Sequence, residues 1–193
     1  MTSAGMTEPQ VGTLDWFLTQ AVTEGLNKMI QSQLHYLSFA VMGPVIELLG
    51  AVYDSYDFHK PGVSRNRFHA ALQNIPSLKR YACYEGEGTA YDLYENMRCG
   101  MAHVGKPGPS VVFTQRNDAA CGKDHLKTAV FKGKTRLILV CEDLYDDIVQ
   151  AIYLVSTNDD ISLKNRLNQR FVDPNLQPDP PAQVSTLTPH ASG

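Results

Sequence analysis

The spacing of apolar residues along the chain predicts a mainly helical protein. Starting at Thr13, a possible N-cap, apolar residues recur three to four positions apart and predict an amphipathic helix over residues 13–33. The mostly apolar stretch 34–53 predicts a buried helix, which Pro44 is expected to kink or restart because an interior proline removes one backbone hydrogen bond. Similar patterns predict four shorter helices, over residues 64–74, 89–103, 142–156 and 161–171.

Local signals indicate how some of these elements begin and end. Ser64 is expected to cap the helix over 64–74, and Pro76 is expected to end it. A glycine- and proline-rich loop over 105–109 is expected to end the helix over 89–103. These signals divide the centre of the chain into short helices.

Two short segments predict strands. Residues 111–114 and 136–141 are rich in β-branched and aliphatic side chains, and we expect them to pair as a hairpin near residues 110–141. The predicted fold class is therefore mainly α, a helical bundle with a small β-hairpin insertion.

The ends of the chain lack the apolar pattern of its middle. Residues 1–12 and the proline-rich stretch 173–193 are expected to be flexible tails. One domain is expected over residues 13–172, since a chain of 193 residues fits a single domain.

The amino-acid composition and the cysteine spacing indicate the cellular environment for which the protein is suited. The chain is 43% hydrophobic and 19% charged, and its four cysteines form no CxxC pair. With no signal peptide at its start, these features predict a reduced, cytoplasmic protein. The apolar stretch 34–53 is interrupted by polar residues, so we expect no membrane span.

Charge is unevenly distributed although the net charge is only -3. Residues 58–136 contain 13 Lys and Arg against 6 Asp and Glu, whereas the rest of the chain is strongly acidic. Such a basic region suits a polyanion, and Arg65, Arg67 and His69 are candidate contacts to RNA phosphates. The alternative is a surface whose basic side chains meet the acidic ends of the chain in the folded protein.

Common catalytic motifs are missing, and the segment 91–105 holds the most suggestive pair of residues. Arg98 and His103 stand five apart at the end of a predicted helix, just before the glycine/proline loop. Here the sequence resembles the HEPN family, whose mark is Arg, four to six residues, then His. The chain has Cys99 after the arginine, where many members have a polar residue such as Asn, and it has Gly105 where one branch has a tyrosine.

The resemblance implies a HEPN-like helical bundle that cleaves RNA without a metal or other cofactor, in a toxin or phage-defence role. It also implies a homodimer whose groove holds the site, and it allows a cognate inhibitor protein. In this chemistry an imidazole moves protons at the ribose 2′-OH and the leaving 5′ oxygen, while a guanidinium stabilises charge on the phosphate. Arg98 and His103 are then the catalytic residues.

Helix geometry raises a question about this pair, because residues five apart on a regular α-helix point about 140° apart. We expect Gly100 to loosen the helix, the long Arg98 side chain to reach across, or the partner chain to close the gap. Glu95 and Cys99 are candidate supporting residues, since Glu95 and Cys99, and Cys99 and His103, are each four positions apart.

Other interpretations remain open. A catalytically silent HEPN-like module would bind a nucleotide, RNA or a protein partner, and a third possibility is an assembly scaffold. Arg98 could simply pair with a carboxylate, such as Glu95, at a helix end. Cys99 could be a nucleophile activated by His103, and His35 is expected to be a hydrogen-bonded core residue. The carboxylates at the start of the helix over 142–156 suit either that helix N-terminus or a metal.

Overall fold

The computed structural model describes residues 8–118 and 124–172. Its first helical stretch covers most of the predicted range 13–33. It comprises α1 (Leu14–Trp16), a π-helical segment η1 (Phe17–Val22) and α2 (Thr23–Gln31). Thr13 is the N-cap, and its hydroxyl accepts a hydrogen bond from the Trp16 N–H. Of the side chains that the pattern assigned to one face, four are buried and Phe17, Met29 and Ile30 are half-buried; the buried ones are Leu14, Leu18, Val22 and Leu26.

The second helix, α3 (His35–Gly50), is the central helix and continues as the 3-10 turn η2 (Ala51–Tyr53). It runs through Pro44 without a break, so the predicted restart does not occur. Gly43 and Gly50 lie two turns apart on one face. A Cβ at Gly43 would lie 3.1 Å from the Cα of Arg98, and a Cβ at Gly50 would lie only 1.7 Å from the carbonyl oxygen of Arg67. Two neighbouring helices therefore cross α3 at these glycines.

The helix α4 (Ser64–Asn74) has the predicted bounds, but Ser64 is not its cap. The cap position is Val63, which makes no side-chain capping bond, so the expected cap at Ser64 is wrong by one position. Pro76 does end the helix and opens the 3-10 segment η3 (Pro76–Tyr84). The apolar residues Phe68, Ala71, Leu72 and Ile75 are fully buried, as their spacing predicts.

The helix expected over 89–103 is shorter and of another kind. Its regular part, η4 (Tyr94–Val104), is a π-helix, and residues 89–92 are irregular. Gly105 ends it in the left-handed conformation with φ 69°, which glycine adopts without strain. The predicted loop over 105–109 follows.

The small sheet differs from the predicted hairpin. Its strands are β1 (Val111–Thr114), β2 (Thr128–Phe131) and β3 (Lys134–Val140), in the order β1-β3-β2. The two predicted strands, β1 and β3, pair in parallel and so form no hairpin. The hairpin joins β2 to β3 through Lys132 and Gly133, both with positive φ, as a two-residue hairpin turn requires.

Two further helices close the fold. In α5 (Cys141–Ser156) the predicted apolar face is buried, and α6 (Ile161–Leu167) is shorter than expected. The Gly12 carbonyl accepts hydrogen bonds from the Phe171 and Val172 N–H groups, so residue 12 of the expected tail is tied to the end of the described chain. Residues 1–7 and 173–193 of the expected tails lie outside the described residues.

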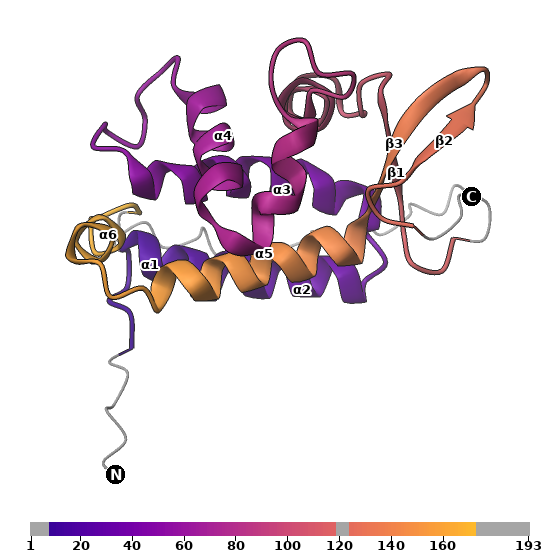
Figure 1. Ribbon diagram of the computed structural model, residues 1–193. Coiled ribbons are helices and arrows are strands. Elements are labelled where there is room, and N and C mark those ends of the chain that lie inside the picture. The colour runs from indigo at the N-terminus through magenta and orange to yellow at the C-terminus, as the bar shows by residue number, and fades with distance from the viewer. Residues whose placement is uncertain (1–7, 119–123, 173–193) are drawn as a thin grey trace, which may run out of the picture.

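The described part of the chain is thus mainly helical, with the three-stranded sheet at one end (Figure 1). One buried apolar cluster extends from Leu14 to Leu167. Within the described residues, one helical stretch, His35–Tyr53, is long and apolar enough to cross a membrane, and 56% of its most apolar window is buried against the rest of the protein, as in a core helix.

Candidate active site

The π-helical form of η4 changes the relation between Arg98 and His103. In an α-helix these residues would point about 140° apart. A π-helix joins each residue to the fifth one along the chain by its backbone hydrogen bonds, so residues five apart lie on successive turns of one side. This local register, and not a loosened α-helix at Gly100, brings positions 98 and 103 toward one side of η4, although the described chain shows no contact between the two side chains.

Gly100 has a different role, which is to admit the loop that follows η4. The Lys106 N–H donates to the Gly100 carbonyl (3.3 Å), and the Gly108 N–H donates to the Asn96 carbonyl (2.8 Å). A Cβ at Gly100 would lie 2.7 Å from the Lys106 carbonyl oxygen. The loop over 105–109 therefore folds back onto η4, and this contact fixes the last turn of the helix, where His103 lies.

Arg98 pairs with Glu47 of α3. Its Nε and one terminal nitrogen each lie 2.8 Å from the same Glu47 carboxylate oxygen. Both side chains are less than one fifth exposed. Burial acts to lower the pKa of Arg98, but the Glu47 carboxylate more than offsets it and holds the pKa above the ordinary value. The expected pairing of Arg98 with a carboxylate is thus observed, with Glu47 in place of Glu95.

His103 is exposed on the last turn of η4. Within the described residues its imidazole has no hydrogen-bond or ion-pair partner. The side chain is therefore open to a ligand that approaches this end of the helix. The structure shows no hydrogen bond between His103 and Cys99 in the described chain.

The two candidate supporting residues, Glu95 and Cys99, lie beside residues other than Arg98 and His103. Glu95 lies 2.5 Å from Arg65, and Arg65 is also within 3.0 Å of Asp92. Cys99 is half-buried, and burial of the Tyr94 ring together with the nearby Cys99 thiol raises the pKa of Tyr94. Neither Glu95 nor Cys99 directly supports the pair of Arg98 and His103.

Two of the three predicted RNA contacts do not suit that role. Arg67 is 4% exposed, donates to Asp54 (2.6 Å) and to the Phe58 carbonyl (2.8 Å), and so holds the loop over 54–62 in place. Arg65 is surrounded by carboxylates, which already neutralise its charge. His69 is exposed on α4, and its contact with RNA stays a prediction.

Other basic residues of the central region meet the acidic start of α5. Arg80 lies 2.5 Å from Asp147, while Arg116 lies 2.8 Å from Asp143 and 2.5 Å from Asp146. These ion pairs match the alternative in which the basic middle of the chain meets its acidic parts. They also explain the α5 carboxylates without a metal ligand role.

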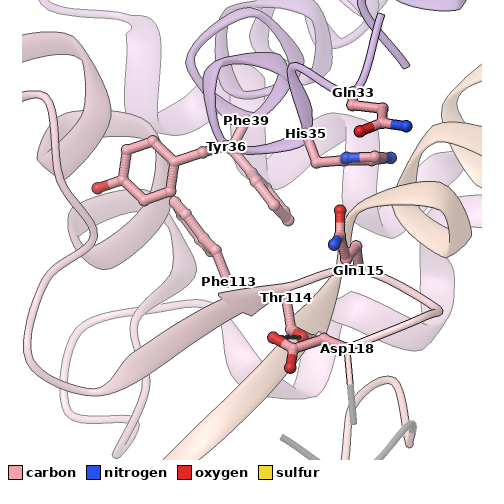
Figure 2. Close-up of a pocket in the computed structure, with 8 residues that line it drawn as sticks. All are labelled: Gln33, His35, Tyr36, Phe39, Phe113, Thr114, Gln115 and Asp118. Atoms are coloured by element: carbon pink, nitrogen blue, oxygen red, sulfur yellow. Dashed lines mark hydrogen bonds between the residues drawn. The ribbon is translucent and has the colours of Figure 1, made fainter. Parts of the chain in front are cut away.

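A cavity that the sequence did not indicate lies between the start of α3 and the end of β1. It has a volume of about 240 Å³ (Figure 2). Phe39 and Phe113 stack within it, with ring centroids 3.9 Å apart and planes within 8°. The other lining residues are Gln33, His35, Tyr36, Thr114, Gln115 and Asp118.

His35 belongs to this cavity and not to the closed core. Its Nε2 lies 3.3 Å from the Glu142 carboxylate, and its side chain is 17% exposed. The apolar residues around His35 predicted a hydrogen-bonded core position. The sequence did not reveal that its partner would be Glu142, which is distant along the chain.

The cavity and the catalytic candidates lie along the same pair of helices. Gly43 of α3 is closest to Arg98, while the Tyr36 hydroxyl donates to the Gly105 carbonyl (3.2 Å). The two helices are therefore antiparallel, and His103 lies between Arg98 and the end of η4 that Tyr36 contacts. Arg98, His103 and the cavity therefore lie in that order along the pair of helices formed by η4 and α3.

Comparison of the chain with protein-family models, with curated proteins and with solved structures finds no match. The functional inference therefore depends on the geometry of η4 and its surroundings.

Proposed function

We propose that this chain is a HEPN-type endoribonuclease that needs no metal, with Arg98 and His103 as its catalytic residues. The observation that supports the proposal most is the π-helical register of η4, since it places residues five apart on one side of the helix. The exposure of His103 at the end of that helix adds to it. A toxin or phage-defence role, with a cognate inhibitor protein, follows from the family resemblance.

The proposed reaction is an internal transfer at phosphorus. One His103 takes the proton of a ribose 2′-OH, and the 2′ oxygen attacks the adjacent phosphorus. The bond from phosphorus to the 5′ oxygen breaks, and a second, protonated imidazole supplies the proton that the leaving oxygen needs. The products are a 2′,3′-cyclic phosphate and a free 5′-hydroxyl. Arg98 stabilises the negative charge that grows on the phosphate oxygens.

One chain supplies one His103, so the proposal includes a homodimer that brings two of them to one groove. An exposed apolar stripe begins at Leu34, the N-cap of α3, and continues through Leu37 and Val41; these side chains are 44%, 53% and 37% exposed. Val104 at the end of η4 is 64% exposed. A second copy that covered this stripe would bring its own η4 close to the first.

Cleavage of RNA in excess chelator tests the proposal. The wild-type protein should degrade single-stranded RNA, and His103→Ala should abolish cleavage while leaving helical content and oligomeric state unchanged. His59→Ala is the matched control, because His59 is also exposed but lies in the loop before α4. Cleavage that survives in His103→Ala would contradict the proposal.

A silent binding module is the second candidate, and one observation favours it. The guanidinium of Arg98 is already held by Glu47, so a phosphate must compete with that carboxylate. Such a module would bind RNA or a nucleotide and raise its melting temperature without cleaving it. The same assay in chelator separates the two candidates.

A further inference from the structure

We propose that the hairpin of β2 and β3 is an RNA-binding arm, which holds the phosphates of a single strand with three cations and one of its bases against Phe131. The three cations, which we call the hairpin cations, are Lys132, Lys134 and Arg136. The inference rests on the proposed function for the choice of RNA as the polyanion. It extends that function by naming where the substrate is held outside the catalytic pair.

The hairpin keeps its positive charge, unlike most of the basic region. Residues 124–140 contain four Lys and Arg against one Asp and no Glu, a balance of +3 in a chain of net charge -3. The one carboxylate, Asp124, lies 2.5 Å from Lys127. The arginines of the central helices face carboxylates, whereas the hairpin cations have no ion-pair partner in the described part of the chain. A polyanion is therefore attracted to the hairpin more than to those helices.

The pairing of β2 with β3 places an aromatic ring beside two of these cations. Residues directly opposite each other in an antiparallel pair lie on the same face of the sheet. Phe131 is opposite Lys134, and Arg136 follows two positions later on that face. Phe131 is half-buried, and its ring contacts no other aromatic ring within residues 8–118 and 124–172. Cations beside an exposed aromatic edge suit a single strand, whose bases stack on aromatic side chains while its backbone meets positive charge.

Arg136 has one buried donor without an acceptor. Its Nε is buried and makes no hydrogen bond within the described residues, although the residue as a whole is half-buried. A buried N–H without an acceptor costs free energy. A guanidinium can donate to a phosphate with two parallel N–H groups, and Nε–H can be one of them. A phosphate beside Arg136 would satisfy this donor once the side chain turns toward the ligand.

The hairpin is connected to η4 through Ser110. The Ser110 N–H donates to the Asn96 side-chain oxygen (3.1 Å), and the Ser110 carbonyl accepts from the Leu137 N–H of β3 (2.9 Å). Asn96 belongs to η4, the helix of the proposed catalytic pair. From Leu137 to Lys134 the strand spans about 10 Å, and the hairpin extends away from the helices (Figure 1). A single strand cleaved at η4 would continue along this arm.

The salt dependence of RNA binding tests the inference. The measurement is the fluorescence anisotropy of a labelled single-stranded RNA of mixed sequence with His103→Ala protein, which leaves the strand intact, at several salt concentrations. Replacing all three hairpin cations with glutamine should weaken binding about tenfold or more. It should also lower the slope of log affinity against log salt by about 2, because each phosphate contact to a single strand contributes about 0.7.

The matched control removes the same charge elsewhere. It replaces three exposed lysines outside the hairpin with glutamine, and both the affinity and the salt slope should stay nearly unchanged. These lysines are Lys28, Lys60 and Lys79.

Phe131 provides a second test, which separates contact with a base from contact with a phosphate. Phe131→Leu keeps an apolar side chain at this half-buried position but removes the ring. RNA should then bind about tenfold more weakly, the scale of one stacked base, with an unchanged salt slope. Binding of inorganic polyphosphate, which has no bases, should not change. Far-UV circular dichroism and the melting temperature check that the variant is folded.

The outcomes separate this inference from the ribonuclease. An equal loss of affinity in the hairpin and control variants would overturn the RNA-binding arm even if wild-type protein cleaves RNA. Hairpin-dependent affinity in a protein whose wild type does not cleave would uphold the arm and contradict the ribonuclease. Equal weakening of polyphosphate and RNA by Phe131→Leu would overturn the base contact. Hairpin-dependent binding to phosphatidylserine vesicles without binding to RNA would overturn the inference, since it would assign the hairpin to a lipid surface.

Discussion

Arg98 has two possible partners, Glu47 in the free protein and a phosphate in the proposed complex. Because both nitrogens reach one Glu47 oxygen, the carboxylate competes directly with RNA. Glu47→Gln should therefore tighten RNA binding several-fold, at a cost of about 1–3 kcal/mol in the free energy of unfolding. Anisotropy titration and thermal unfolding measure the two effects. Weaker binding would show that Glu47 positions Arg98 productively.

Replacing Arg98 itself tests its catalytic role. Arg98→Lys keeps a cation but loses the two parallel donors, and we expect cleavage to slow by about 100-fold or more, the loss typical of one stabilising donor. Melting temperature and RNA affinity, measured in parallel, separate this loss from unfolding. A rate within a few-fold of wild type would exclude Arg98 from the site.

His125 should make stability depend on pH. Burial holds the pKa of His125 at about 4, below its ordinary value of 6.5. The Val140 N–H donates to Nδ1, so Nε2 carries the proton and donates to Tyr81, whose hydroxyl donates to Asp147. The unfolded chain binds a proton more readily, so stability should fall as pH decreases from 6.5 to 4, by at most about 1.4 kcal/mol per unit.

Thermal unfolding across this range tests the role of His125. Burial raises the pKa values of Asp147 and Glu85, so their protonation acts in the opposite sense as pH falls. The difference in slope between wild type and a His125 variant therefore reports on His125. His125→Phe should reduce the fall in stability between pH 6.5 and 5, and an unchanged slope would contradict the role of His125.

The sequence offered Arg98 and His103 as candidates, which stays a prediction, but it gave no indication of the residues around them. Glu47 lies 51 positions from Arg98, and Asp54 lies 13 from Arg67, so no local pattern indicates either pairing. A basic residue on a short amphipathic helix has the same local signal whether it is exposed, like His69, or buried, like Arg67.

The close packing of η4 against the loop over 105–109 depends on Gly100, which has no side chain. Gly100→Ala would place a methyl group 2.7 Å from the Lys106 carbonyl oxygen, and backbone cannot move aside as a side chain can. We expect a loss of about 1–3 kcal/mol in stability, together with slower cleavage as the turn bearing His103 shifts. Thermal unfolding and the chelator assay measure both effects.

Gly25→Ala is the matched control for that experiment. Gly25 lies inside α2, and a Cβ there would meet nothing within 4 Å. Alanine should therefore stabilise the protein by about 0.5–1 kcal/mol through helix propensity and leave cleavage unchanged. Stabilisation by both substitutions would contradict the close approach of the loop to η4.

Elements with one buried face were predictable, and elements fixed by distant partners were not. The apolar residues of α4 and α5 are buried as their spacing predicts. The short strand β2 has no such stripe, and strand pairing depends on partners far along the chain, so the hairpin was assigned to the wrong strands. The turn that joins β2 to β3 is Lys132-Gly133, in which only the glycine favours positive φ, so the local turn signal was weak. The π-helical register of η4 has no comparable signal.

For the whole molecule, the proposed dimer depends on the stripe along α3. Leu37→Asp should leave the monomer folded, because this side chain is 53% exposed, but should prevent association and abolish cleavage. Ile161→Asp is the control, since Ile161 is 70% exposed on α6, away from the stripe. Analytical ultracentrifugation gives the oligomeric state. A Leu37→Asp protein that is still dimeric would place the interface elsewhere.

The mainly helical character of the whole molecule could be predicted from the sequence, whereas the spatial order of Arg98, His103 and the cavity could not. That order depends on the antiparallel contact of α3 with η4, which two separated contacts define. Neither contact has a local signal in the sequence.

Mixing wild-type protein with His103→Ala protein tests whether each active site needs the imidazoles of two chains. The measurement is the initial rate of RNA cleavage in excess chelator, after subunits have exchanged, as the variant fraction increases. If each site needs two imidazoles, an equal mixture should keep about a quarter of the wild-type rate, since about one dimer in four then holds two wild-type chains. The pure variant should be inactive. Cleavage by the pure variant at the wild-type rate would contradict the account.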